Sequence, residues 1–133
     1  MGYAAFFAVS MILVSSVAMA TDHIVGDDDG WTLDFDYTQW AQDRVFRVGD
    51  NLVFIYDNIS HNVFKVNGTM FKDCTNPPAN EALSSGHDII PLKTGGRKWY
   101  ICGVDDHCAR EMKLVINVQG EGSPSPAPSP AHG

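Results

Sequence analysis

The sequence predicts an all-β fold, a β-sandwich with one or two short helices, and three observations support this prediction. Residues 21–119 contain several short runs that are rich in β-branched and aromatic side chains. Turn-forming residues separate these runs at short intervals. Neither a long amphipathic helical pattern nor an internal repeat is present in the sequence. Many short strands with regular turn signals are typical of a sandwich.

The elements follow from local patterns along the chain. Strands are expected, in chain order, at 22–25, 45–47, 51–56, 62–66, 88–92, 97–102 and 112–118. Residues 48–50 form the turn between the second and third of these segments. Pro91 lacks a backbone N–H and therefore places segment 88–92 toward a sheet edge. Short helices are expected at 37–41 and 69–73.

The N-terminal segment, residues 1–20, is predicted to be a signal peptide. It carries no charged side chain, contains an apolar run from Phe6 to Val17, and ends in Ala18-Met19-Ala20. This ending matches the small-residue pattern of a signal-peptidase site, so we expect cleavage after Ala20. An uncleaved membrane anchor is disfavoured because the apolar run is short for a bilayer span. Secretion would place the domain, residues 21–119, in an oxidising compartment that permits a disulfide.

The C-terminal segment, residues 120–133, is expected to be an extended Pro/Ser-rich tail. Its alternating prolines offer no hydrophobic pattern with which to build a core. Such a tail fits association with the cell wall or the outer face of the plasma membrane. A GPI anchor is not supported, because no hydrophobic segment follows the polar stretch; either there is no lipid anchor or the sequence is incomplete at this end.

Charge and size narrow the class of function. The formal net charge is −7, and no Lys/Arg-rich run is present, which argues against nucleic-acid binding. An acidic surface favours cationic partners. About 100 residues remain for the domain, enough for a small sandwich but not for a large enzyme cleft. We therefore expect a monomeric carrier protein and not an enzyme.

The odd number of cysteines is the strongest functional signal. The chain has three, Cys74, Cys102 and Cys108, so one thiol is left over and needs an explanation. Cys102 is followed by His107 and Met112 at equal steps of five residues. A thiolate, an imidazole and a thioether form a soft ligand set that suits copper.

A fourth ligand is expected from His61, which precedes the predicted strand 62–66. If that strand neighbours the one ending at Cys102, His61 reaches the same end of the sandwich. Two imidazoles, one thiolate and a weak thioether make the trigonal type-1 copper arrangement. Structural zinc prefers Cys and His without Met. A catalytic role of Cys102 with a histidine has no further support in the sequence.

Taken together, these residues resemble the phytocyanins, the plant branch of the cupredoxin family. The resemblance spans Thr21 to Gln119; its motifs are Val25-Gly26, Gly30-Trp31, residues 37–41, 46–50 and 60–63, the Cys74 region, and 99–114. It implies a Greek-key sandwich and one copper ion, with His61, Cys102 and His107 as equatorial ligands and Met112 as axial ligand. It also implies a disulfide between Cys74 and Cys108, which would leave Cys102 free for the metal. Met112 and the Pro/Ser tail look most like the uclacyanin group.

The sequence departs from the family pattern at two places near the ligands. Glu111 stands where the residue before the axial ligand is usually glycine, so a positive φ there would strain the backbone. Asp105 and Asp106 stand where many relatives have a Pro-Gly-like turn. Their charges should favour Cu(II), so an Asp105→Pro/Asp106→Gly variant is expected to have a higher reduction potential.

Three further features carry expectations. Asn58 and Asn67 begin N-glycosylation sequons, and a glycan on Asn58 would restrict access to His61. Asn62 is expected to join the two ligand loops by a hydrogen bond. His23 would become the third residue after cleavage, where it could complete a square-planar Cu(II) site with the new amine; the alternative is that its segment simply forms the first strand.

The sequence thus predicts a secreted type-1 copper protein that carries single electrons. An extracellular structural or signalling glycoprotein, in which copper redox is secondary, is the alternative. A metal-buffering protein is a third reading. The electron donor and acceptor are not named by the sequence.

Overall fold

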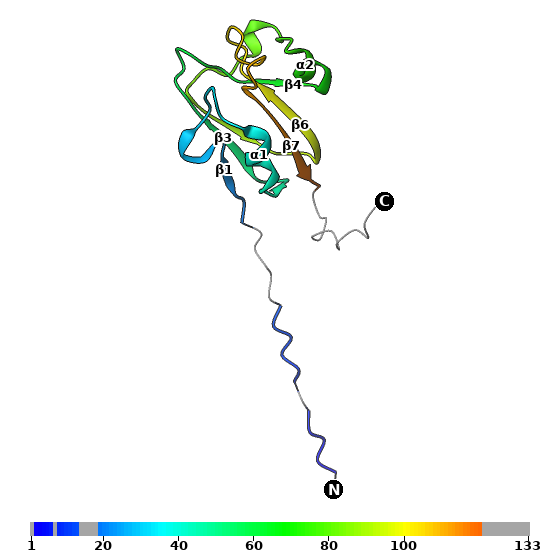
Figure 1. Ribbon diagram of the computed structural model, residues 1–133. Helices are drawn as coiled ribbons and strands as arrows, with labels where there is room; N and C mark the ends of the chain where they lie inside the picture. Colours follow the sequence, from blue (N-terminus) through cyan, green and yellow to red (C-terminus); the bar gives the residue numbers. More distant parts are fainter. Residues whose placement is uncertain (1, 7, 14–18, 121–133) are drawn as a thin grey trace.

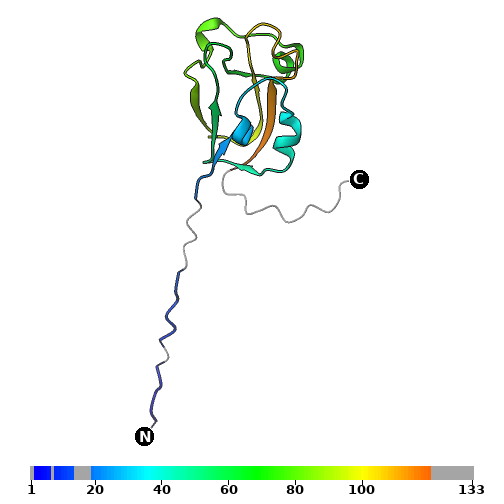
Figure 2. The same ribbon diagram turned by 60° about the vertical axis from the view of Figure 1, so that its left-hand side comes forward.

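The computed structural model describes residues 2–6, 8–13 and 19–120, and in it two β-sheets face each other (Figures 1 and 2). The larger of two hydrophobic clusters lies between them. The all-β sandwich expected from the sequence is confirmed. The predicted signal peptide lies partly outside the described residues, and the tail beyond Gly120 lies wholly outside them. Among the described segments, no helix is both long and apolar enough to cross a membrane.

The first sheet has three strands in the order β1-β3-β5. They are β1 (Asp22–Ile24), β3 (Asn51–Ile55) and β5 (His87–Pro91). Strand β1 runs parallel to β3, whereas β5 runs antiparallel to it. Strand β5 is an edge strand that ends at Pro91, as the missing proline N–H predicts.

The second sheet has four strands in the order β2-β7-β6-β4. They are β2 (Phe46–Arg47), β7 (Lys113–Gln119), β6 (Gly96–Ile101) and β4 (Phe64–Val66). Strand β6 pairs antiparallel with both β7 and β4, and β2 pairs parallel with the end of β7. Inward-facing residues alternate with outward-facing ones along β7, which explains its strong sequence pattern.

Two short α-helices begin at side-chain caps. The carboxylate of Asp36 accepts the N–H of Gln39 at 3.0 Å at the start of α1 (Tyr37–Gln42). Asn67 accepts the N–H of Met70 at 2.8 Å at the start of α2 (Gly68–Asp73). Such caps satisfy backbone donors that the first helical turn leaves unpaired. Two 3₁₀ turns, η1 (Asp27–Asp29) and η2 (Ala79–Glu81), complete the elements.

The core lies between the sheets and includes aromatic side chains from both sheets and from α1. Phe54 of β3 and Tyr100 of β6 contact across it, with ring centroids 5.6 Å apart. Tyr37 is buried, and its hydroxyl accepts the N–H of Thr32 at 2.8 Å and donates to the carbonyl of Gly30 at 2.7 Å. Burial raises the pKa of Tyr37 to about 12, so this phenol stays protonated as a structural donor.

The topology brings two loops to one end of the sandwich. Strand β4 begins at Phe64, which pairs with Ile101 at the end of β6. The loop 56–63 that enters β4 therefore lies beside the loop 102–112 that leaves β6. Both loops lie at the end of the sandwich opposite the start of β1 and the end of β7 (Figure 1). The predicted ligands come from these two loops.

Candidate metal centre

Three metal-ligating atoms converge at this end of the sandwich. The Sγ of Cys102 lies 3.5 Å from the Nδ1 of His107 and 3.9 Å from the Nδ1 of His61. The two imidazole Nδ1 atoms are 3.2 Å apart. All three atoms thus lie within 4.8 Å of one another, which is the spacing expected of ligands that share one ion.

His61 is held by a tight turn that begins at Asp57. The backbone carbonyl of Asp57 accepts the N–H of both Ser60 and His61, at 3.2 and 3.0 Å. Its carboxylate accepts the N–H of Ile59 at 2.9 Å. These bonds from Ile59 and from the Ser60 hydroxyl hold the pKa of the Asp57 carboxyl below its usual value. The turn fixes the backbone of His61 before the chain enters β4.

The other ligand loop is closed by backbone hydrogen bonds between its predicted ligands. Cys102 donates its N–H to the carbonyl of Met112 at 3.1 Å. Met112 in turn donates to the carbonyl of His107 at 3.0 Å, and its side chain is buried. Cys102, His107 and Met112 are therefore neighbours through the backbone. Residues five apart in sequence lie together because the loop folds back on itself.

The surroundings set the protonation of the ligands. Burial raises the pKa of the Cys102 thiol, although the amides of Asn62 and Val104, which donate toward the sulfur, oppose this shift. Burial also lowers the pKa of His61, as does the nearby His107, against the opposing charge of Asp57. A neutral imidazole is the form that binds metal. A metal ion must displace the thiol proton, so binding releases a proton.

Asn62 joins the two loops, as the sequence predicts. Its Oδ1 accepts the N–H of Gly103 at 2.7 Å. Its backbone carbonyl accepts the indole N–H of Trp31 at 2.9 Å. Gly103 has no room for a side chain, because a Cβ there would lie 2.2 Å from the Phe64 ring. The backbone beside both Cys102 and His61 is thus fixed by close packing and hydrogen bonds.

A disulfide joins Cys74 to Cys108 and leaves Cys102 as a free, buried thiol. The pairing implied by the resemblance is confirmed. Cys74 is the C-cap residue directly after α2, so the bridge fastens the 102–112 loop to the end of that helix. The free thiol is the one that faces the two imidazoles, which is the condition the copper prediction required.

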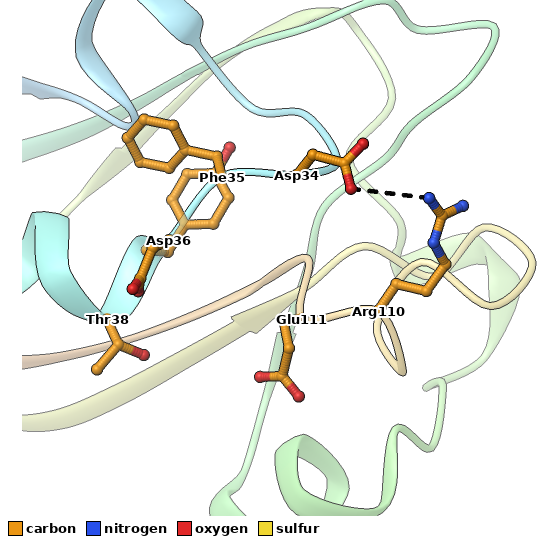
Figure 3. A pocket seen from close by; sticks show the side chains of 7 residues that line it. Asp34, Phe35, Asp36, Thr38, Arg110 and Glu111 are labelled. Carbon is orange, nitrogen blue, oxygen red and sulfur yellow. Dashed lines mark ion pairs between the residues drawn. The ribbon is translucent and has the colours of Figure 1, made fainter.

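Two residues of the 102–112 loop adopt positive φ angles. Glu111, next to Met112, has φ 70°, and Asp105 has φ 44°. The expected backbone strain at Glu111 is therefore present. Figure 3 shows the pocket of ≈ 540 Å³ that this part of the loop lines, with Asp34 and Arg110 on one side and Glu111 on another. The exposed Arg110 guanidinium lies 3.8 Å from Asp34, which itself has φ 64°.

The other predicted site residues are not among these ligands. His23 is buried and lies 2.9 Å from Asp50, and the nitrogen of Thr21 also bonds to that carboxylate. These contacts favour the reading of His23 as part of β1 over a second copper site. Asn58 and Asn67 are exposed, and Asn67 uses its Oδ1 to cap α2. The sequence pattern predicts only a turn position for Asp50, because its partners Thr21 and His23 are distant along the chain.

The donor set fits copper better than other metals. Two imidazole nitrogens and a thiolate, with a methionine buried beside them, match the soft set of a type-1 copper site. Structural zinc sites use four Cys and His ligands without methionine. Hard cations such as Mg²⁺ and Ca²⁺ require oxygen ligands, and the grouped atoms are nitrogen and sulfur.

Comparisons with known proteins agree with this geometry. A family model described as a plastocyanin-like domain matches residues 31–112. Blue copper protein 1a of Medicago truncatula is 74% identical over 125 residues, covering 93% of this chain and 78% of that protein. The structure of cucumber stellacyanin with Cu²⁺ superposes with a TM-score of 0.73 at 34% identity, covering 79% of this chain and 100% of that one. Cucumber basic protein, a blue copper protein, gives a TM-score of 0.67 at 35% identity, covering 74% and 99%.

Proposed function

Because this chain belongs to the plastocyanin-like phytocyanin family, we propose that it is a type-1 blue copper protein that carries single electrons. The observation that carries this proposal is the convergence of one free thiol and two imidazoles within 4.8 Å of one another. The same thiol is spared from the disulfide, which uses the other two cysteines.

In this proposal His61, Cys102, His107 and Met112 would together hold one copper ion. The bound ion would supply one-electron redox chemistry between its Cu(I) and Cu(II) states. Burial of Cys102 and Met112 keeps water from both sulfurs. The hydrogen bonds of Asn62 and the closed 102–112 loop hold the ligands in one geometry whatever the charge of the ion.

The two imidazoles offer the route to a redox partner. His61 and His107 are partly exposed, whereas Cys102 and Met112 are buried. A partner would therefore approach over these rings at the end of the sandwich. Ile59, in the same turn as His61, has an apolar side chain that is 90% exposed. We propose that the protein catalyses no substrate conversion itself, since passing one electron needs contact and no substrate cleft.

The setting of this activity is also part of the proposal. Residues 1–20 would be removed as a signal peptide, residues 21–119 would form the secreted domain, and residues 120–133 would be a Pro/Ser-rich tail that associates with the cell wall. Asn58 and Asn67 would carry N-glycans, which their exposure permits. The protein would act as a monomer on a cationic partner, in keeping with its net charge of −7.

Reconstitution with copper tests the proposal. The domain beginning at Thr21 is purified without metal and titrated with Cu(II) while absorption and EPR spectra are recorded. We expect one equivalent of copper to give an intense absorption band at about 600 nm from thiolate-to-copper charge transfer. Cys102→Ser should abolish the band, and Met112→Gln should keep it while changing the reduction potential. A colourless copper-loaded protein would instead support a structural glycoprotein or a metal buffer.

A further inference from the structure

The carboxylate of Asp50 is buried at the end of the sandwich opposite the metal centre. The residue is only 5% exposed, and it lies between β2 and the start of β3. Its Oδ1 accepts the backbone N–H of Thr21 at 3.0 Å. Its Oδ2 accepts the N–H of Arg47 at 2.9 Å and lies 2.9 Å from the Nε2 of His23. A buried carboxylate is costly unless such partners compensate it.

The partners of Asp50 lack a permanent cation. Among the residues that the structure describes, no side-chain nitrogen of Lys or Arg lies within 4.0 Å of this carboxylate. His23 faces it through Nε2, and within the described part of the chain the buried Nδ1 of the same ring has no hydrogen-bond partner. Burial alone would raise the pKa of Asp50, but the hydrogen bonds from His23, Thr21 and Arg47 outweigh it and lower the pKa. The site thus stabilises an anion without a full counter-charge.

We propose that Asp50 is a buried receptor for the α-ammonium group that removal of residues 1–20 creates at Thr21. The inference rests on the predicted cleavage after Ala20. The nitrogen that now donates to Oδ1 as a neutral amide is the atom that would become the charged terminus. Thr21 is exposed, so the remaining N–H groups of the ammonium can be hydrated. Processing would place a positive charge on the donor of a bond whose acceptor is already an anion. The bond would then join two opposite charges, which is stronger than a bond in which only the acceptor is charged.

The strand register makes this contact specific for one N-terminus. The carbonyl of Thr21 accepts the N–H of Asn51 at 2.9 Å, and Asp22 accepts from the Asn51 side chain at 2.9 Å. These bonds fix β1 against β3. One residue along a strand is about 3.3 Å, so a terminus one residue longer or shorter would carry its charge out of hydrogen-bond range of Oδ1.

Unfolding measurements on four proteins test the proposal. One protein begins at Thr21 and one at Ala20, both with Asp50 intact. The other two have the same two N-termini and carry Asp50→Asn. At pH 7 we expect the Thr21 start to lower the unfolding equilibrium constant about tenfold relative to the Ala20 start, which corresponds to about 1.4 kcal/mol. The difference should disappear with Asp50→Asn. Equal stability of the two intact proteins, or a difference that persists with Asp50→Asn, would overturn the proposal.

A pH series on the intact proteins gives a readout that does not depend on the folding of Asp50→Asn. An unperturbed α-amino group has a pKa of about 7.7–8.0, and pairing with Asp50 should raise it in the folded state. The extra unfolding free energy of the protein that begins at Thr21, relative to the one that begins at Ala20, is then fully present below about pH 8. It is lost as the pH rises through the higher pKa of the amine in the folded state. Acetylating the Thr21 amine should remove the advantage at every pH. The other ionisable groups around this end (His23 and Asp22 on β1, Arg47 on β2 and Lys93 after β5) are identical in all three proteins.

The cleavage position is tested separately. N-terminal sequencing of the protein secreted from plant cells should give Thr21 as the first residue. If the secreted protein begins at another residue, Asp50 does not bind its N-terminal ammonium group, whatever the unfolding measurements on the four purified proteins show. The copper band should be equal in the Thr21 and Ala20 proteins, because the metal centre lies at the opposite end (Figure 1).

Discussion

The side-chain Oδ1 of Asn62 accepts the backbone N–H of Gly103 at 2.7 Å, and this bond joins the residue after His61 to the residue after Cys102. The backbone N–H of Asn62 also points toward the Cys102 sulfur and opposes the rise in its pKa. One residue thus supports a histidine and the thiol at once. Since outer contacts of this kind orient ligands, Asn62 should matter to the metal site more than its half-exposed position suggests.

Asn62→Ala is expected to weaken both the fold and the site. The unpaired N–H of Gly103 should cost about 1–3 kcal/mol of unfolding free energy, and copper affinity should fall about 10–100-fold. Denaturant unfolding of the metal-free protein and competition titration with a copper chelator measure the two effects. Asn76→Ala is a matched control, because Asn76 donates to the carbonyl of the same Gly103 at 2.9 Å from an exposed position. Equal copper affinities in the two variants would contradict the role given to Asn62.

Glu111→Gly is expected to stabilise the protein. Glu111 has φ 70°, a conformation that costs a residue with a Cβ roughly 1–2 kcal/mol and glycine almost nothing. The greater freedom of glycine in the unfolded chain offsets part of this gain, so we expect an increase of up to about 1 kcal/mol in unfolding free energy, measured by urea denaturation. Asp34→Gly, in the same pocket with φ 64°, should gain less, because aspartate tolerates this conformation better. A less stable Glu111→Gly protein would show that the side chain itself contributes.

The strands and helices could be predicted because their residues carry local patterns. The segment predicted at 97–102 is β6 (Gly96–Ile101), and the helix predicted at 37–41 is α1 (Tyr37–Gln42). The ligands could be predicted because a free thiol, a histidine and a methionine lie close in sequence. His61 required one assumption, that its strand neighbours the strand of Cys102, and the pairing of Phe64 with Ile101 confirms it.

Contacts between distant segments could not be predicted in the same way. The parallel pairing of β1 with β3 has no local signal, so the approach of Thr21 and His23 to Asp50 was not foreseen. The left-handed backbone of Asp105 was likewise missed. An aspartate allows this conformation, but its sequence neighbours do not demand it.

The conformation of Asp105 changes how the charge near the ligands should be tested. Asp105 has φ 44°, whereas proline fixes φ at about −65°. Asp105→Pro would therefore change the backbone of the loop as well as remove the charge. Asp105→Asn removes the charge and keeps the conformation accessible. Without this carboxylate Cu(II) is less stabilised, and we expect the reduction potential to rise by tens of mV at low salt, measured by protein-film voltammetry. Asp43→Asn, at the end of α1, removes an equal charge away from the ligand loops and should shift the potential less. An unchanged or lower potential in Asp105→Asn would contradict the electrostatic argument.

Acid should destabilise the domain through Asp50. Burial raises the pKa of this carboxyl, but the hydrogen bonds from His23, Thr21 and Arg47 lower it further than burial raises it. A folded-state pKa below the unfolded value of about 3.9 contributes stability that is present above that pH and is lost as the pH falls through the folded pKa. Unfolding free energies measured from pH 6 to pH 2 should therefore fall more steeply in the wild type than in Asp50→Asn. Asp28→Asn, on the exposed turn η1, should keep the wild-type slope, because that carboxylate is exposed and no hydrogen bond to it is seen in the described chain. The Asp50→Asn protein should start from lower stability at pH 6, since the amide that replaces the second oxygen cannot accept from both Arg47 and His23.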